Sequence, residues 1–268
     1  LLSDELASAL YYGPSTSTGD GVIMATADGI NAATRLMEYG KRYPNGVEVS
    51  KGIAKSTIAG NITGWTMSAI LVNAEGERVV NEKASNRTIL EAELAQTGSE
   101  LFLLMDSETF NVWKTKLAAA GLTEETIDGY VAANGTTAPV FAHGDTLEEV
   151  AAAAGVNGEN LVKTVERYNG FVAAGNDEDF GRSADYMTMA IGDGPYYLVE
   201  QKPRFATTMG GLVVNASLQV ENTDGDVIPG LYAAGEVVGG VMGDDSPSGA
   251  NNGWALTAGK LAAEAIAE

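Results

Sequence analysis

The segment that most limits how this chain can fold lies close to its C-terminus. An apolar stretch predicts a buried strand at 227–234, which ends at Gly235-Glu236. A glycine-rich loop follows at 239–253, and an alanine-rich stretch predicts a helix at 254–268. A strand, a glycine-rich loop and a helix in this order direct backbone N–H groups toward an anionic or dipolar ligand. The carboxylate at the strand end is suited to accept hydrogen bonds from ligand hydroxyls. The same pattern also fits an ordinary glycine-rich crossover, so this segment alone leaves both interpretations open.

Composition excludes several classes of protein. The chain has 16 Lys and Arg against 36 Asp and Glu, a formal net charge of −20, whereas nucleic acids and anionic membranes attract basic surfaces. It has no cysteine and one histidine, His143, which excludes disulfides, thiol nucleophiles, cysteine-ligated metals and multi-histidine metal sites. We therefore expect no nucleic-acid partner and no metal site. No apolar run approaches the about 18 residues of a membrane span, so none is expected, and the cellular compartment stays open.

The coarse pattern along the chain indicates an inserted middle domain. Apolar residues at helical spacing predict a helix at 22–38, and a run of five apolar residues predicts a buried strand at 101–105. Residues 47–64 are small, polar and glycine-containing, which indicates an irregular connector. The composition shifts near residue 45 and again near residue 205, where a mixed helical block gives way to glycine-rich strands and loops. Two shifts of this kind suggest one domain placed between two parts of another.

Several motifs resemble those of a known family. The most specific are Thr208-Met209-Gly210-Gly211, the run from Val227 to Val237, and Thr18-Gly19-Asp20-Gly21. They resemble the flavoprotein subunits of the fumarate reductase/succinate dehydrogenase family. The similarity is greatest to the soluble FAD-containing fumarate reductases and to their relatives urocanate reductase and 3-ketosteroid dehydrogenase. Further matching segments, such as Val165-Glu166-Arg167-Tyr168-Asn169, follow in order along the whole chain.

The resemblance implies FAD as cofactor and an α+β fold. In that fold, a partial, Rossmann-like FAD-binding domain is interrupted by an inserted α+β capping domain that closes over the flavin. Residues 1–42 and 205–268 would belong to the FAD-binding domain, and residues 43–204 would form the capping domain.

One family motif is not found in this sequence. It is the dinucleotide fingerprint Gly-x-Gly-x-x-Gly that follows the first strand. We therefore expect a fragment that lacks an N-terminal FAD-domain segment, or a second polypeptide that supplies the adenine and pyrophosphate half of the site. Relatives also suggest an upstream electron-donor domain as a partner.

Position by position, the resemblance places FAD contacts at five residues: Asp20, Thr207, Glu236, Asn251 and Asn252. Asp20 and Glu236 match the family in identity. Thr207 stands where fumarate reductases have a histidine. The two asparagines stand where those enzymes have small or aliphatic residues that contact the flavin through the backbone.

The positions that would bind a small-molecule substrate depart from the fumarate reductase pattern. In the glycine-rich loop, Ser246 replaces the arginine that binds a carboxylate, and Gly249 closes the same loop. The two substrate histidines correspond to Tyr43 and Ala206, and a Thr-Glu pair of the cap begins at Asn61. Arginine is the side chain that matches carboxylate geometry in a bidentate way. Its replacement argues against fumarate as the substrate.

Charge and aromatic content indicate a different substrate. Asp244-Asp245 lies where a dianion would dock, and like charges repel. Trp65, Tyr43 and Trp254 align near the expected pocket. We therefore expect an α,β-unsaturated substrate without two carboxylates, of aromatic or steroid-like character.

Two residues are candidates for moving the proton. The family's general-acid arginine falls at Asn86, so Arg87 takes this role if the alignment slips by one residue; it also suits a surface position. Tyr43 is the second candidate, as an acid or an oxyanion donor. The resemblance implies hydride transfer between flavin and an activated C=C bond. Two alternatives stay open: an oxidation like that of 3-ketosteroid dehydrogenase, and a non-catalytic module that binds a partner.

Overall fold

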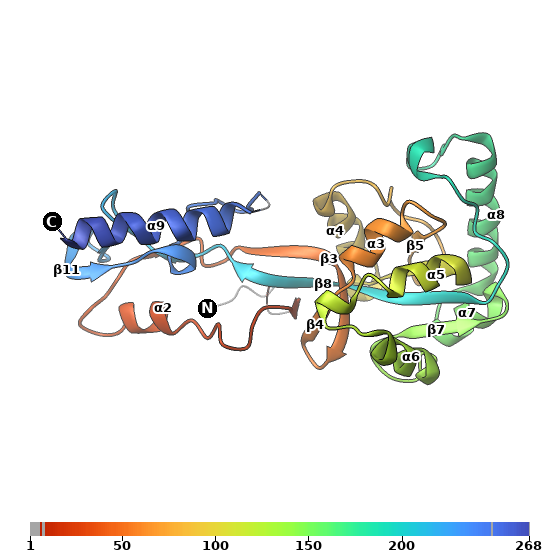
Figure 1. Ribbon diagram of the computed structural model, residues 1–268, viewed down its shortest axis with the longest axis horizontal. Helices are drawn as coiled ribbons and strands as arrows, with labels where there is room; N and C mark the ends of the chain where they lie inside the picture. Colours follow the sequence, from red (N-terminus) through yellow and green to blue (C-terminus); the bar gives the residue numbers. More distant parts are fainter. Residues whose placement is uncertain (1–5, 7–8, 248, 268) are drawn as a thin grey trace. The chain divides into compact units, whose positions relative to one another are not determined.

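The chain divides into two compact units, shown in the computed structural model of Figure 1. The structure describes residues 6, 9–247 and 249–267. The first unit takes the described residues of Leu1–Ala9, Gly13–Lys41 and Phe205–Glu268. The second unit takes Leu10–Tyr12 and Arg42–Arg204. Each unit has its own hydrophobic core and is described below by itself.

The second unit is built on one mixed sheet. Its strands are β1 (Leu10–Tyr11), β3 (Gly40–Ser50), β4 (Ile53–Ser56), β5 (Ile70–Val72), β6 (Leu101–Asp106), β7 (Phe141–Gly144) and β8 (Tyr196–Thr208). They pair in the order β1-β4-β3-β8-β6-β5, and β7 also pairs with β8. The helices are α3 (Ile58–Gly64), α4 (Asn86–Leu94), η1 (Thr97–Ser99), α5 (Ser107–Lys114), η2 (Ala118–Ala120), α6 (Glu124–Ala133), α7 (Leu147–Ala154), α8 (Gly158–Ala174) and η3 (Ala184–Tyr186).

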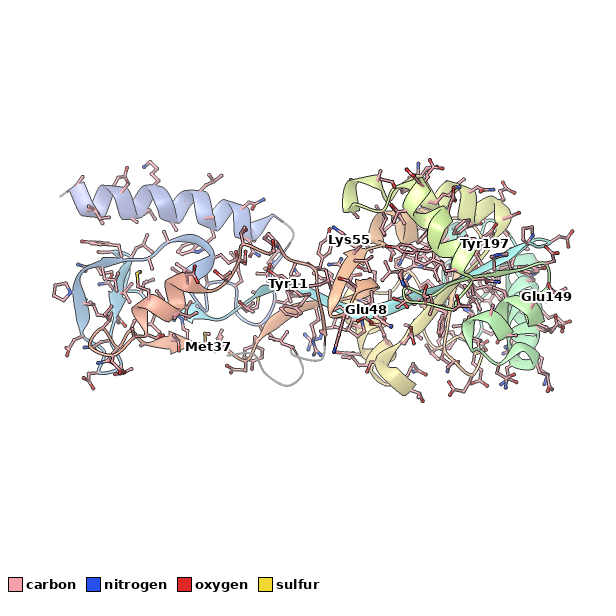
Figure 2. All side chains as sticks on the ribbon, turned by 90° about the horizontal axis from the view of Figure 1, so that it is seen from below. Tyr11, Met37, Glu48, Lys55, Glu149 and Tyr197 are labelled. Atoms are coloured by element: carbon pink, nitrogen blue, oxygen red, sulfur yellow. The ribbon has the colours of Figure 1, made fainter. Side chains whose placement is uncertain are left out.

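Both faces of this sheet are covered, as β6 shows. Alternate side chains of a strand point to opposite faces of its sheet. Every residue of β6 is buried, so both faces of the sheet are covered at this strand. Leu101, Leu103 and Met105 pack in a core with residues of α4, α5 and α6, whereas Phe102 and Leu104 pack in a second core with residues of α7 and α8. Tyr197, labelled in Figure 2, adds to the first core by stacking on Phe110 with ring centroids 3.8 Å apart.

The first unit is smaller and has less core. Its elements are α2 (Asp20–Ala25), β2 (Thr34–Arg35), β9 (Gly211–Leu212), β10 (Gln219–Glu221), β11 (Val227–Tyr232), η4 (Gly235–Val237) and α9 (Ala250–Ala267), together with the ends of β3 and β8. β2 pairs with β9, and β10 pairs with β11 in an antiparallel hairpin. Small residues such as Ala25, Ala233 and Ala258 supply much of the core. None of the helices in the described part of the chain is long and apolar enough to cross a membrane.

The structure corrects three local expectations. The helix expected at 22–38 is wrong beyond Ala25, because Gly29, Asn31 and Leu36 have positive φ angles of 88°, 54° and 54° that an α-helix does not allow. The connector expected at 47–64 is wrong as well, since it contains the end of β3, all of β4 and all of α3. The strand expected at 227–234 is present as β11, but its residues are exposed or half-buried rather than buried. The buried strand expected at 101–105 is confirmed as β6.

Candidate functional site

The first unit contains a cavity of about 290 Å³ at the start of α9. It gathers four of the five residues expected to contact FAD, namely Thr207, Glu236, Asn251 and Asn252. The residues lining it come from the end of β8, from η4, from the loop after η4 and from the first turns of α9: Thr207, Thr208, Met209, Gly235, Glu236, Val238, Val241, Met242, Asn251, Asn252, Trp254 and Ala255. Segments more than 40 residues apart in sequence therefore meet at this cavity.

Close backbone packing holds the turn that carries Glu236. Val238 forms a parallel bridge with Leu212, and the N–H of Gly239 donates to the Leu212 carbonyl over 3.1 Å. A Cβ on Gly211 would clash with the carbonyl of Val237, so only glycine allows this approach. The arrangement fixes η4 against β9 through backbone contacts, and the side chain of Glu236 extends from it.

The polar groups of the cavity are suited to a flavin. Among the described residues, Glu236 makes no hydrogen bond or ion pair, and it is exposed, so its carboxylate remains able to accept from hydroxyl groups. Asn251 and Asn252 lie in the first turn of α9, where backbone N–H groups lack partners within the helix and favour negative charge. The volume is at the lower end of the range of about 300–1,000 Å³ for ligand pockets, so it suits part of a dinucleotide rather than the whole.

Asp20, the fifth expected FAD contact, lies beside the cavity rather than in its lining. It is the first residue of α2 and follows Gly19, which has a positive φ of 78°. The next residue, Gly21, packs on η4, because a Cβ there would lie 3.2 Å from a methyl of Val237. The start of α2 is therefore next to the turn that carries Glu236, and the role of Asp20 stays a prediction.

Lys41 ties down the glycine-rich loop of the first unit. Its ammonium donates to the carbonyl and, over 3.3 Å, to the hydroxyl of Ser246, and it lies 2.9 Å from the carboxylate of Asp245. Ser246 is buried by these contacts, whereas Gly249 near the end of the loop is exposed and has a positive φ of 81°. The lysine offsets part of the negative charge of Asp244-Asp245, so this pair repels an anion less than its sequence predicts.

Three further candidate residues lie in different settings, two in the second unit and one in the part of β8 that belongs to the first unit. Asn61 of α3 is buried, donates to Gln201 over 2.7 Å and accepts from the indole of Trp113 over 2.9 Å, so both ends of its amide are bonded to protein. Arg87 lies in the first turn of α4 with 75% of its side chain exposed, paired to Glu91 at 3.2 Å. Their roles at the substrate stay predictions, as does that of Ala206, which is half-buried in β8.

Tyr43 lies in β3, where its ring packs against the guanidinium of Arg204, 4.8 Å from ring centroid to charge centre. Trp65 is instead a core residue of the second unit, 5% exposed, so its expected place in a pocket is wrong. Trp254 does line the cavity of the first unit. Sequence reasoning missed Arg204 because nothing in the local pattern Lys-Pro-Arg-Phe shows that the arginine is buried.

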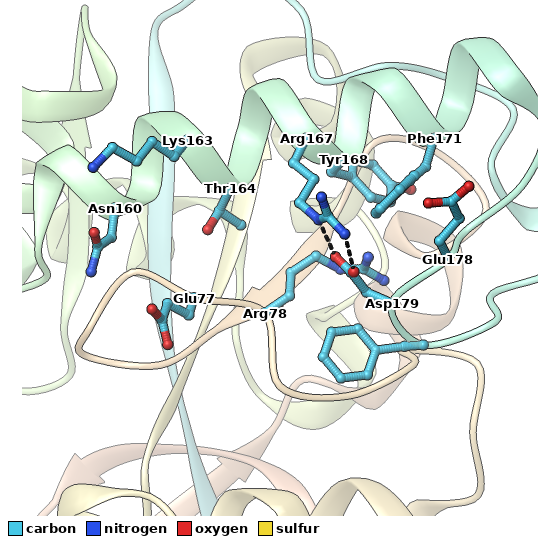
Figure 3. A pocket seen from close by; sticks show the side chains of 11 residues that line it. Glu77, Arg78, Asn160, Lys163, Thr164, Arg167, Tyr168, Phe171, Glu178 and Asp179 are labelled. Carbon is cyan, nitrogen blue, oxygen red and sulfur yellow. Dashed lines mark hydrogen bonds and ion pairs between the residues drawn. The ribbon is translucent and has the colours of Figure 1, made fainter.

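A larger hollow of about 510 Å³ lies on the second unit between α8 and two loops (Figure 3). Arg167 reaches from α8 to Asp179 with two hydrogen bonds of 2.7 and 2.5 Å, and beside them Arg78 pairs with Glu82 at 2.9 Å and with Asp177 at 3.1 Å. Paired charges of this kind hold α8 to the loops. None of the residues expected from the sequence to bind FAD or substrate lines this hollow.

Comparison with known proteins identifies the family. Residues 2–252 match the model of a family described as FAD binding domain. The chain belongs to this family of FAD-binding flavoproteins, so FAD is its cofactor, and the fumarate reductase/succinate dehydrogenase resemblance and the α+β fold are confirmed. The donor and acceptor groups of the 290 Å³ cavity fit part of that cofactor.

Three similar proteins illustrate the family. A fumarate reductase (cytochrome) of Shewanella frigidimarina is 34% identical over 253 residues, which are 94% of this chain and 40% of that protein. A urocanate reductase of Eggerthella lenta is 33% identical over 227 residues, 85% of this chain and 35% of that protein. The crystal structure of a 3-ketosteroid delta1-dehydrogenase from Sterolibacterium denitrificans superposes with a TM-score of 0.75 at 25% identity, covering 100% of this chain and 50% of that one. The chain thus spans less than half the length of the first two relatives.

Proposed function

We propose that this chain is the flavin- and substrate-binding part of an FAD-dependent oxidoreductase that acts on the activated C=C bond of a substrate without two carboxylates. The single observation that carries the proposal is the cavity that brings Thr207, Glu236, Asn251 and Asn252 together in the first unit. The first unit would bind FAD through two segments, Gly13–Lys41 and Phe205–Glu268, and the second unit would serve as the capping domain.

The residues of the cavity would hold and orient the flavin. When bound, FAD supplies the hydride chemistry. The Glu236 carboxylate would accept hydrogen bonds from hydroxyl groups of the cofactor's ribityl chain. The N-terminal end of α9, with Asn251 and Asn252, would present donors to electron-rich atoms of the ring. Trp254 would close the apolar side of the cavity. Its indole donates to the carbonyl of Gly235 over 3.0 Å, which fixes α9 against η4.

The glycine-rich loop argues against fumarate as the preferred substrate. Where fumarate reductases have an arginine, this chain has Ser246, which is buried against Lys41. A serine bonded in this way has no charge to offer a second carboxylate. For the proton step we propose Tyr43 or Arg87, each on an element of the second unit.

The remaining flavin contacts would come from polypeptide other than these 268 residues. The sequence contains no Gly-x-Gly-x-x-Gly motif for the pyrophosphate. The first unit also exposes large apolar side chains on α2 and α9, among them Met24, Leu256 and Ile266 at 60%, 79% and 61%. Exposed apolar residues on one small unit indicate a surface that another part of a protein covers. A further FAD-domain segment, and an electron-donor domain, are the partners that we propose.

An oxidation in the direction of 3-ketosteroid dehydrogenase is the second candidate function. The observation that favours it is the placement of a tyrosine, Tyr43, against a buried arginine where fumarate reductases have a histidine. A tyrosine whose ring lies beside a cation is suited to stabilising an oxyanion on a ketone substrate.

Turnover by the flavin-loaded protein tests the proposal. Under anaerobic conditions, oxidation of reduced methyl viologen is measured with urocanate and with fumarate, and flavin reduction is measured with a 3-ketosteroid. We expect kcat/KM for urocanate to exceed that for fumarate at least tenfold. Faster reduction of fumarate would contradict the substrate assignment, and turnover of the steroid alone would select the second candidate. No turnover of any of the three by flavin-loaded protein that also carries the further FAD-domain segment would favour a non-catalytic module.

A further inference from the structure

Arg204 is a buried cation held by neutral groups. It lies in β8 and is 5% exposed. Its Nε and Nη2 atoms donate to the side-chain oxygen of Asn45 over 3.0 and 2.7 Å, and Nη2 donates to the hydroxyl of Ser56 over 2.8 Å. The guanidinium also lies over the rings of Tyr12 and Tyr43, 4.5 and 4.8 Å from the centroids. Burial lowers the pKa of Arg204 to about 10, while the two tyrosines oppose that shift, so the side chain stays charged at neutral pH.

Arg204 differs from other arginines of the second unit, because none of its partners in the described part of the chain is a carboxylate. Arg78 and Arg182 are buried too, and both pair with the carboxylate of Glu82, at 2.9 and 3.1 Å. The exposed Arg167 pairs with Asp179. Among the described residues, no Asp or Glu forms an ion pair with Arg204. A buried charge without a counter-ion is costly, because desolvation is not repaid by an opposite charge.

The group around Arg204 has more donors than acceptors. Nη1 makes no hydrogen bond to a described residue and retains contact with solvent. The side-chain nitrogen of Asn45 is enclosed without an acceptor. Exchanging the oxygen and nitrogen positions of the Asn45 amide would not pair this nitrogen, since the oxygen is needed where it is to accept from Arg204. A cation that has an N–H group without a partner among the described residues and lies beside two aromatic rings is suited to binding a planar anion.

We propose that Arg204, with the rings of Tyr12 and Tyr43, is a binding site for one carboxylate of a planar organic acid. Nη1 would donate to a carboxylate oxygen, and the tyrosine rings would pack on the flat body of the acid. This inference rests on the proposed function in one respect: the acid would be the unsaturated substrate, which would then carry a single carboxylate. A steroid without a carboxylate would not use this site.

A purely structural role for Arg204 is the competing explanation. Its hydrogen bonds link β8 to β3 through Asn45 and to β4 through Ser56. A residue that serves only as this link would affect stability and leave the binding of acids unchanged. A binding role therefore predicts that affinity depends on the charge of the ligand, whereas a purely structural role does not.

Calorimetric titration of the 268-residue chain with benzoate and methyl benzoate tests the site. The two probes share a planar ring, have no reducible C=C bond outside it and differ in charge, so binding is separated from turnover. We expect saturable binding of benzoate at millimolar concentrations and at least tenfold weaker binding of the ester. Equal binding of acid and ester, or no binding of benzoate, would overturn the proposal.

Two substitutions and a control complete the test. Arg204→Gln should weaken benzoate binding at least tenfold, and Arg204→Lys should weaken it less, because lysine keeps the charge and loses the planar fork. Arg167→Gln, which removes an exposed and paired arginine of the same unit, should leave binding unchanged. Unaltered binding by a folded Arg204→Gln protein would overturn the proposal. Should that variant not fold, the acid-to-ester comparison on the native chain decides. Benzoate binding without turnover in the viologen assay would contradict the proposed function and not this site.

Discussion

The indole N–H of Trp254 donates to the carbonyl of Gly235 over 3.0 Å, and this bond joins the first turns of α9 to the turn that carries Glu236. Gly235 has a positive φ of 77°, and a Cβ there would touch Ala255 at 3.7 Å. The geometry of the cavity thus depends on one side chain of α9 and one backbone carbonyl of η4.

Loss of that bond should loosen the cavity. Trp254→Phe keeps an aromatic ring and removes the donor, and we expect a loss of about 1 kcal/mol in the free energy of unfolding. Trp254→Ala also removes packing, with an expected loss of about 3 kcal/mol. Urea denaturation followed by circular dichroism measures both. Equal stability of the Phe variant and the native chain would show that the hydrogen bond does not hold α9.

Lys41 should protect the glycine-rich loop from proteolysis. Lys41→Met removes the ion pair with Asp245 and the bonds to Ser246. Exposed ion pairs contribute up to about 1 kcal/mol, so we expect cleavage by an aspartate-specific protease at Asp244-Asp245 to become about two- to fivefold faster. Lys260→Met, which removes an exposed pair on α9, is the matched control. Identical cleavage rates in the two variants would contradict the tethering role.

Glu93 should make the second unit less stable as pH rises. Burial, and then the charge of Glu100, raise the pKa of Glu93 well above its usual 4.5, and neither of its oxygens has a hydrogen-bond partner in the described part of the chain. Between the unfolded and the folded pKa the native state holds one more proton, so stability falls as pH increases through that window. Glu93→Gln should therefore raise the melting temperature at about pH 7 and have little effect below about pH 4.5. Glu91→Gln on the exposed side of α4 is the control, and a Glu93→Gln protein no more stable than that control at neutral pH would contradict this account.

Asp177 should have the opposite pH dependence. Burial raises its pKa, but the hydrogen bonds and charge of Arg78 together with the backbone N–H of Arg182 outweigh burial, so the pKa is lowered from 3.8. The stabilisation is present above about pH 4 and is lost as pH falls through the folded pKa. Asp177→Asn should cost about 3 kcal/mol at about pH 6, because it leaves Arg78 with one carboxylate fewer in a buried site. Urea denaturation at several pH values measures the difference, with Asp185→Asn as an exposed control; a constant difference down to about pH 3 would be inconsistent with the ion pair.

Motif-based reasoning selected four residues, Thr207, Glu236, Asn251 and Asn252, that the structure gathers at one cavity, and their contact with a flavin stays a prediction. The helix expected at 22–38 was wrong because glycine, asparagine and even Leu36 adopt positive φ angles that hydrophobic spacing does not reveal. Arg204 was missed because its burial is produced by β1, β3 and β4, and burial of one residue by distant strands leaves no local pattern.

Fluorescence titration of the 268-residue chain with riboflavin tests the central claim most directly, because riboflavin has the ring and ribityl chain without pyrophosphate or adenine. We predict saturable quenching of flavin emission and at least tenfold weaker binding to Glu236→Ala, the loss expected for about 1.5–3 kcal/mol of hydrogen bonding to a charged acceptor. Asp224→Ala in the exposed turn after β10 should bind like the native chain. FAD should bind no more than a few-fold tighter than riboflavin, since the adenine half would lack its contacts. Absence of quenching, or equal binding by the Glu236→Ala and Asp224→Ala variants, would contradict the assignment of this cavity to the flavin.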